Sequence, residues 1–236
     1  MKDVNWLEVI MVLLFLSVAT LLIACTGADV WVSSQFYKSG GWPVGERFPW
    51  KLLYHLDRYP ALVMAIFGLC AACYGSFKHN WRPWRRQGIF LVLLLALGPG
   101  LMVNVVFKDH WGRPRPRDIV EFGGTTQFYQ PWQPDLNGTG RSFPCGHGSA
   151  AFYLMAPFFI YRRTKPAVAR RWLAGGLIFG LLMGYARIAQ GGHFLSDVLW
   201  AWGMVYLTAL VLSALLLPHW GNVVYSNHSE PHLRRG

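Results

Sequence analysis

Long apolar runs alternate with short polar segments along most of this chain, at a spacing typical of membrane-spanning helices. A helix needs about 20 apolar residues to cross the hydrocarbon core of a bilayer. The pattern predicts spans at 6–25, 61–77, 89–107, 147–161, 172–188 and 194–217. We therefore expect an all-α fold, a polytopic membrane bundle of six transmembrane helices. It would form one domain over residues 1–236, with its chemistry within 101–217 and a polar tail from 218 to 236.

Two of these segments allow more than one interpretation. The first run ends at Ala24-Cys25 and resembles a cleaved signal or lipoprotein leader, but Asp3 and Glu8 dilute the positive charge that such a leader needs. We expect it to remain as a helix. The mixed stretch 26–59 is rich in aromatic residues, which is typical of a segment lying at a bilayer surface.

The distribution of basic residues predicts an orientation. Six spans place both chain ends on one side, together with the strongly basic loops 78–86 and 162–171. Short cytoplasmic loops carry an excess of Lys and Arg. The termini are therefore expected in the cytoplasm, and the loops that contain Lys108 and His193 are expected on the outer face.

Composition agrees with a membrane protein and argues against a nucleic-acid partner. The chain is 53% hydrophobic and only 14% charged, against about 25% charged in soluble domains. The formal net charge is +11, but the basic residues lie between apolar runs and form no basic face or tail. Cys70 and Cys73 lie in an apolar run among small residues, so we interpret them as packing residues.

The segment KDHWGRPRPRD follows the third apolar run and contains the cations Lys108, Arg113, Arg115 and Arg117. Its prolines oppose helix formation and favour an extended backbone before them. Arg presents a planar fork that suits phosphate oxygens, and Lys adds a point charge. The segment is either half of an anion-binding cradle or a basic flank that anchors a membrane helix.

Helix alternation brings further polar groups to the same face. The ends of the third to sixth spans would meet there and would bring together Lys108, Arg115, Cys145, Gly146, His147, Arg187, His193 and Asp197. A missing or extra helix would separate these groups. The prediction is therefore a test of the topology.

Within this set, spacing suggests chemistry. His193 and Asp197 are four residues apart and share a helix face. A carboxylate that accepts from one imidazole nitrogen leaves the lone pair of the other free to attack. Arg187 lies one glycine-containing turn earlier, and Gly146 could offer its backbone N–H to an anion at a helix start. His147, beside it, could give or take a proton.

Each residue taken alone has a simpler explanation. His193 could be an interfacial polar residue, the His193–Asp197 pair could be structural, and Arg187 could extend its charge toward the headgroups. Convergence of several ionisable groups at span ends favours function over these alternatives.

A metal site is the other alternative. His147, His193 and Asp197 could supply three ligands, with His110 nearby. However, the cations Lys108, Arg115 and Arg187 would repel a metal ion. The charge of the set favours an anion, so we predict neither a metal nor a cofactor.

Three segments, in order, resemble the signatures of the type 2 phosphatidic acid phosphatase family: Lys108 with Arg115-Pro116, Pro144-Cys145-Gly146-His147, and Arg187 with His193 and Asp197. The second signature usually has serine where this chain has Cys145, and the third usually has serine where this chain has Ala186. A thiol is a weaker hydrogen-bond donor than a hydroxyl. Cys145 could therefore alter the phosphate site.

The resemblance implies a membrane lipid phosphate phosphatase. By the family pattern His193 would attack phosphorus and form a phosphohistidine, Asp197 would orient it, and His147 would protonate the leaving alkoxide. The phosphate oxygens would be held by Lys108, Arg115, Arg187, Cys145 and Gly146, without a metal.

The substrate prediction rests on a finer resemblance. The segments 122–132 and 142–147 are similar to the bacterial lipid A phosphatase branch, which implies lipid A as substrate and a site on the periplasmic face of the inner membrane. Phosphatidylglycerophosphate and undecaprenyl pyrophosphate phosphatases remain alternatives, as does a lipid phosphotransferase. A protein that binds or transports an anion or lipid, with an inactive cradle, is the non-enzymatic alternative. The oligomeric state stays open.

Overall fold

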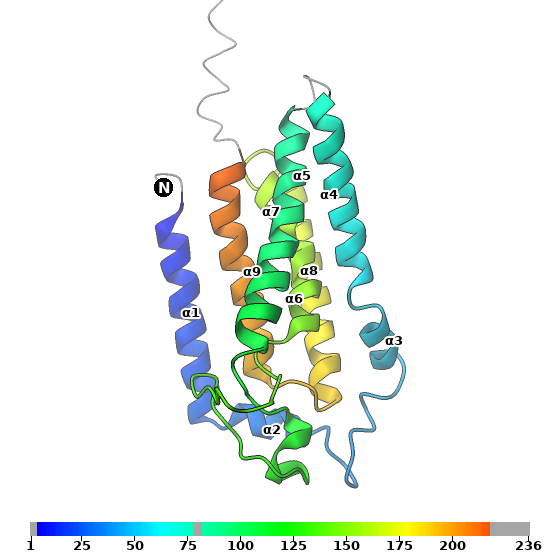
Figure 1. Cartoon of the computed structure of the whole chain (residues 1–236), viewed down its shortest axis with the longest axis vertical. Helices are drawn as coiled ribbons and strands as arrows, with labels where there is room; N and C mark the ends of the chain where they lie inside the picture. Colours follow the sequence, from blue (N-terminus) through cyan, green and yellow to red (C-terminus); the bar gives the residue numbers. More distant parts are fainter. Residues whose placement is uncertain (1–3, 78–81, 218–236) are drawn as a thin grey trace, which may run out of the picture.

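The computed structural model describes residues 4–77 and 82–217 and shows a bundle of long helices running up and down (Figure 1). Its α-helices are α1 (Trp6–Cys25), α2 (Ala28–Ser34), α3 (Trp50–His55), α4 (Tyr59–Phe77), α5 (Arg82–Leu95), α6 (Gly146–Phe152), α7 (Ala156–Tyr161), α8 (Pro166–Ala189) and α9 (Leu195–Leu216). A π-helix η2 (Ala96–Lys108) continues α5, and short 3₁₀ turns are η3 (Pro116–Asp118), η4 (Val120–Phe122) and η5 (Tyr153–Met155). The described residues form no β-strand, so the predicted all-α class is confirmed.

Five helical stretches within the described residues are long and apolar enough to cross a membrane: Trp6–Cys25, Trp50–Phe77, Pro83–Lys108, Pro166–Ala189 and Leu195–Leu216. They correspond to five of the six predicted spans. The chain is a multi-pass membrane protein. The predicted tail 218–236 and part of the basic loop 78–86 lie outside the described residues.

The remaining predicted span, 147–161, differs from expectation. It is divided into α6, η5 and α7, and no piece is long enough to cross a bilayer alone. Pro157 stands in the first turn of α7, where its missing N–H costs no helical hydrogen bond. The segment can be short and interrupted because it is enclosed by the other helices and most of its residues are buried.

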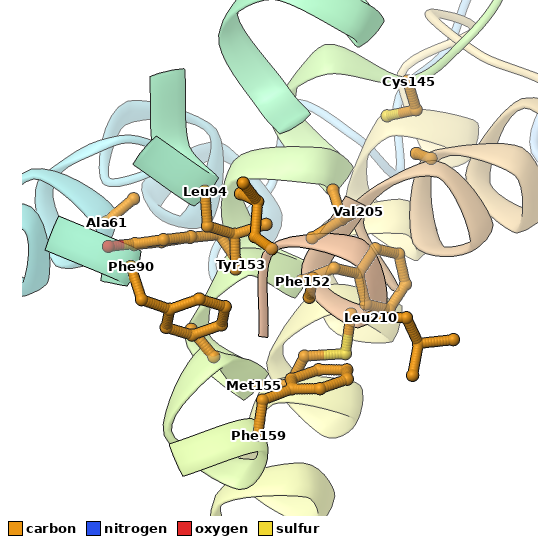
Figure 2. Close-up of a cluster of buried hydrophobic side chains, with 14 of the residues drawn as sticks. Ala61, Phe90, Leu94, Cys145, Phe152, Tyr153, Met155, Phe159, Val205 and Leu210 are labelled. Atoms are coloured by element: carbon orange, nitrogen blue, oxygen red, sulfur yellow. The ribbon is translucent and has the colours of Figure 1, made fainter. Parts of the chain in front are cut away.

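This enclosed segment forms the centre of the hydrophobic core. Phe152, Tyr153 and Phe159 pack there with Phe90 of α5 and Leu210 of α9 (Figure 2). The hydroxyl of Tyr153 donates to the Leu91 carbonyl oxygen at 3.0 Å, which satisfies the one polar atom that this side chain brings into the core.

The second half of the third span forms the wide π-helical turns of η2. Pro99 lies inside them and has no N–H to donate. Asn104 Nδ2 donates to the Pro99 carbonyl oxygen at 2.6 Å, five residues back. Widened turns of this kind occur often at functional sites. Here they end at Lys108.

The predicted meeting of span ends is confirmed as geometry. The carboxyl ends of α1, η2 and α8 and the amino ends of α4, α6 and α9 lie at one end of the bundle, beside α2 and α3 (Figure 1). The stretch 26–59 is therefore more than a surface segment. Its helix α2 packs against α9, and Asp29 of α2 is buried there.

Candidate active site

The turn between α8 and α9 presents His193 to the end of the bundle. Gly191 adopts a positive φ of 62°, and a Cβ there would lie 2.2 Å from the Trp42 ring. A Cβ on Gly192 would lie 2.5 Å from Arg187 Nη2. Position 191 therefore requires glycine, and the turn brings the Arg187 guanidinium close to the backbone that carries His193.

The His193 ring is 1% exposed and is held in one orientation. Its Nδ1 lies 2.6 Å from the Ser142 carbonyl oxygen. A carbonyl only accepts hydrogen bonds, so Nδ1 carries the proton and the lone pair of the neutral ring is on Nε2. Asp197 Oδ2 lies farther away, at 3.6 Å from Nδ1. The direct hydrogen bond expected from the helical spacing is thus replaced by one to Ser142.

Asp197 acts on His193 through the neighbouring backbone. Its Oδ2 accepts from Ser142 Oγ at 2.5 Å and from the Phe194 N–H at 2.7 Å. These bonds fix the residues on either side of the imidazole. The carboxylate still adds a negative charge close to the ring.

Arg113 occupies a different place from the other cations of its segment. The residue is completely buried, and Nη1 donates to Asp197 Oδ1 at 2.5 Å while Nη2 donates to Asp29 Oδ2 at 2.8 Å. Its guanidinium lies 4.6 Å from the centre of the Phe194 ring. Asp29 also accepts from the Ser196 backbone at 2.8 Å. Arg113 and Asp29 therefore hold Asp197 and the start of α9 in place, a role that sequence spacing alone did not reveal.

Cys145 lies at the start of α6 and contacts the His193 ring. Its backbone N–H donates to the Asp197 carbonyl oxygen at 3.1 Å, and its Sγ accepts from the Gly148 N–H at 3.3 Å. Burial alone would raise the pKa of the thiol, but the charge and hydrogen bond of His193 lower the pKa overall. Burial alone would likewise lower the pKa of His193, but Cys145 and Asp197 raise it overall.

Lys108 and Gly146 meet across the site. A Cβ on Gly146 would lie 2.9 Å from Lys108 Nζ and 2.6 Å from Asn104 Oδ1. Glycine at 146 therefore leaves room for the ammonium group beside the backbone of α6. Lys108 also lies within electrostatic range of Arg115 and Arg187.

The two arginines carry unused hydrogen-bond donors. Within the described residues, four buried side-chain nitrogen or oxygen atoms have no partner, and two of them are Nε of Arg115 and Nε of Arg187. Arg187 Nη1 donates to Gln190, and its guanidinium lies 4.8 Å from the centre of the Tyr54 ring. Burial lowers the pKa of Arg115, and the neighbouring Arg117 lowers it further. Unpaired donors among repelling cations favour an incoming anion.

His147 stands on the more open side of the site. Its Nε2 lies 3.4 Å from Asp57 Oδ2, and its ring stacks on Tyr54 with centroids 5.1 Å apart. Asp57 and Tyr54 come from α3 and the turn that follows it. Neither was identified from the sequence, because nothing in their spacing links them to His147. Burial lowers the pKa of His147 to about 2, and the neighbouring Arg187, His193 and Lys108 contribute to this lowering.

The possible metal ligands do not form a cluster. In the part of the chain that the structure describes, no three His, Cys, Asp or Glu side chains are grouped so that they could hold a metal ion. His110 is exposed, and its Nδ1 lies 3.0 Å from the Val105 carbonyl oxygen. What the structure does bring together is a fixed imidazole, a second histidine and at least three cations.

Comparisons with known proteins point in the same direction. The sequence profile of the PAP2 superfamily matches residues 89–220. The chain is 39% identical over 163 residues to the lipid A 4′-phosphatase of Francisella tularensis subsp. novicida, covering 66% of this chain and 68% of that protein. It is 30% identical over 229 residues to the lipid A 4′-phosphatase of Rhizobium leguminosarum, covering 88% of this chain and 93% of that protein.

The fold also has a solved counterpart. The crystal structure of a transmembrane PAP2-type phosphatidylglycerolphosphate phosphatase from Bacillus subtilis matches with a TM-score of 0.56 at 18% sequence identity. The match covers 88% of this chain and 94% of that chain. At this identity the likeness concerns the fold alone.

Proposed function

Because the chain belongs to the PAP2 superfamily and is a membrane lipid phosphatase, we propose that it removes the 4′-phosphate of lipid A through a phosphohistidine at His193. The observation that carries this proposal is the orientation of His193. Its Nδ1 is bound to the Ser142 carbonyl oxygen, so the Nε2 lone pair is available to a phosphorus atom placed among the surrounding cations.

The first step breaks the bond between phosphorus and the lipid oxygen. His193 Nε2 attacks phosphorus, the P–O bond breaks, and His147 gives its proton to the leaving alkoxide. In the second step water attacks the phosphohistidine, His147 takes the water proton, and the P–N bond breaks to release inorganic phosphate. Using one group as acid and then as base follows from the reversal of the two steps.

The cations lower the barrier by neutralising charge. The transferred phosphoryl group carries negative charge on three oxygens, and phosphoryl transfer depends mainly on positioning and on charge stabilisation. Lys108, Arg115 and Arg187 would hold these oxygens. The unpaired Nε atoms of the two arginines supply donors that no protein group uses.

Asp57 would position His147 for the proton transfers. Its Oδ2 is 3.4 Å from His147 Nε2, close enough to hold the ring in one orientation. Tyr54 stacks on a face of the same ring, and the Arg187 guanidinium lies over the Tyr54 ring. The acid and one phosphate ligand are thus arranged around a single tyrosine.

The relatives and the pattern of charge support the proposed substrate and location. Two relatives, each aligned with this chain over most of its own length, are named lipid A 4′-phosphatases. Lipid A has its phosphates on a sugar headgroup, and the proposed site lies at helix ends, where headgroups lie. With the basic loops in the cytoplasm, the site would face the periplasm of a bacterial inner membrane.

Phosphate release from lipid A tests this proposal. Purified protein in detergent should remove one phosphate from bisphosphorylated lipid A, with and without a chelator of divalent metals. Mass spectrometry of the product identifies the phosphate lost. His193→Ala should abolish release, and His110→Ala, a histidine outside the site, should leave it unchanged. Release that requires metal would contradict the metal-independent mechanism.

The orientation has its own test. Cysteine variants at the exposed residues Arg141 and Arg163, in a chain without its natural cysteines, should differ in labelling of intact spheroplasts by an impermeant maleimide. Arg141→Cys should label and Arg163→Cys should not. The reverse pattern would place the site in the cytoplasm.

A further inference from the structure

A second, polar pocket lies beside the phosphate cradle, among the loops that follow η2. Its volume is about 480 Å³, within the range of roughly 300–1,000 Å³ that is usual for ligand sites. The side chains that matter for its chemistry are Arg115, Arg117, Asp118, Thr125, Asp135 and Arg141. None of the groups proposed for bond breaking lines it.

The pocket is joined to the proposed phosphate site. Arg115 lines the pocket and also lies within electrostatic range of Tyr54, the residue that stacks on His147. The backbone N–H of Arg117 donates to the Gly191 carbonyl oxygen at 3.2 Å, two residues before His193. A ligand whose phosphate lies against Arg115 therefore has its neighbouring atoms at the mouth of this pocket.

The walls of the pocket are held by backbone contacts. Thr126 N–H donates to the Asp118 carbonyl oxygen at 3.0 Å, and Asp135 N–H donates to the Trp111 carbonyl oxygen at 3.0 Å. Gly112 has a φ of 68°, and a Cβ there would lie 1.8 Å from the Asp135 carbonyl oxygen. The loops thus touch directly through their backbones, so the pocket exists without a ligand.

The lining contains both donors and acceptors. The three arginines donate, and the carboxylates of Asp118 and Asp135 accept. Asp118 Oδ2 accepts from the Arg115 N–H at 3.3 Å, and Asp135 Oδ1 accepts from the Asn137 N–H at 3.3 Å, so each carboxylate still has acceptor capacity. A second phosphate could pair with the arginines but would leave the two carboxylates without a donor. A sugar hydroxyl donates and accepts, and matches such a lining.

We propose that this pocket binds the sugar ring that carries the phosphate, so that the protein selects phosphorylated glycolipids over phosphorylated glycerolipids. The inference rests on the proposed lipid phosphatase function and deepens it. The ligand class is an acylated hexosamine phosphate. The pocket contributes to binding and specificity, and the chemical step belongs to the cradle next to it.

Substrate discrimination tests the inference. The variant Asp135→Asn/Thr125→Val removes one charged acceptor and one hydroxyl and keeps their shapes. Its kcat/KM is measured on an acylated glucosamine phosphate and on phosphatidic acid with the same acyl chains. We expect a fall of tenfold or more on the glycolipid and a change of less than twofold on phosphatidic acid. The matched control Glu121→Gln/Thr164→Val changes residues of the same kinds outside the pocket and should alter neither value.

A binding measurement separates the pocket from catalysis. In the His193→Ala background, acyl-free glucosamine 4-phosphate should bind at least tenfold more tightly than glycerol 3-phosphate, and the pocket variant should abolish this preference. The inference would be overturned if the pocket variant lost kcat/KM equally on both substrates or affinity equally for both ligands. It would also be overturned if the variant lost neither. Tighter binding that depends on a second phosphate and not on the sugar would overturn it too. If the wild type releases phosphate from no lipid, the proposed function fails, while the sugar preference still decides the pocket.

Discussion

The two histidines of the proposed site have very different surroundings. His193 is enclosed by groups that are almost completely buried, among them Asp197, Arg113 and Cys145. His147 depends on Tyr54 of α3, a helix with no buried residue, and on Asp57 of the turn after it, which is 8% exposed. The His193 side of the site is part of the helical bundle. The His147 side is formed with α3 and the turn after it, which pack against the bundle.

The difference matches the two proposed tasks. A nucleophile must approach phosphorus along one line, so its ring has to be fixed in position. A general acid has to stay within hydrogen-bonding reach of the leaving oxygen, which departs with the whole lipid. The less buried side is therefore the side on which the lipid would enter and leave.

The largest expected effect comes from breaking the buried support. Arg113→Met leaves Asp29 and Asp197 buried without their cation and should destabilise the fold by about 3–5 kcal/mol. Thermal unfolding in detergent, followed by tryptophan fluorescence, measures the change. Arg141→Met makes the same substitution at an exposed cation that pairs with Asp109 and should change the midpoint little. Equal unfolding midpoints for Arg113→Met and Arg141→Met would contradict the idea that buried contacts hold the His193 side of the site in place.

A smaller and more selective effect is expected on the open side. Asp57→Asn should leave the unfolding midpoint near that of the wild type and lower kcat on a lipid phosphate about 10²-fold, at the low end of what general acid catalysis contributes. The loss should largely disappear with p-nitrophenyl phosphate, whose leaving group needs no proton. A loss of the same size on both substrates would show that Asp57 does not act through His147.

The smallest change concerns Cys145. Cys145→Ser should keep kcat/KM within about threefold near the optimum, since the hydroxyl is the better donor to phosphate. The negative charge and the hydrogen bond of Cys145 raise the pKa of His193, and His193 must be neutral to attack. Removal of the thiol lowers this pKa and should move the acid limb of the pH–rate profile to lower pH. A shift to higher pH, or complete loss of activity, would show that the thiol has another role.

The same contrast explains what the sequence could and could not predict. Apolar run lengths and helix alternation predicted that Lys108, His147, Arg187 and His193 would meet at one end, and the structure brings them within electrostatic range of one another. The interruption of the enclosed span could not be predicted from its apolar character, because packing by neighbours permits a short helix.

The supporting residues were hidden for a different reason. Arg113 and Arg115 are two residues apart in one basic segment, and only tertiary contacts decide that the first is buried with two carboxylates. Asp29 and Asp57 lie in the stretch 26–59, where no periodicity relates them to the signatures. Spacing predicted the groups at helix ends, while the residues that hold them come from loops.

The most direct test of the account is to trap the covalent intermediate. Protein mixed rapidly with ³²P-labelled lipid phosphate and quenched in base, which preserves phosphohistidine, would be digested and analysed by mass spectrometry. The account predicts label on His193 that appears faster than free phosphate and is absent from His193→Ala. Label on His147 or Cys145, or near-normal turnover by His193→Ala, would contradict it.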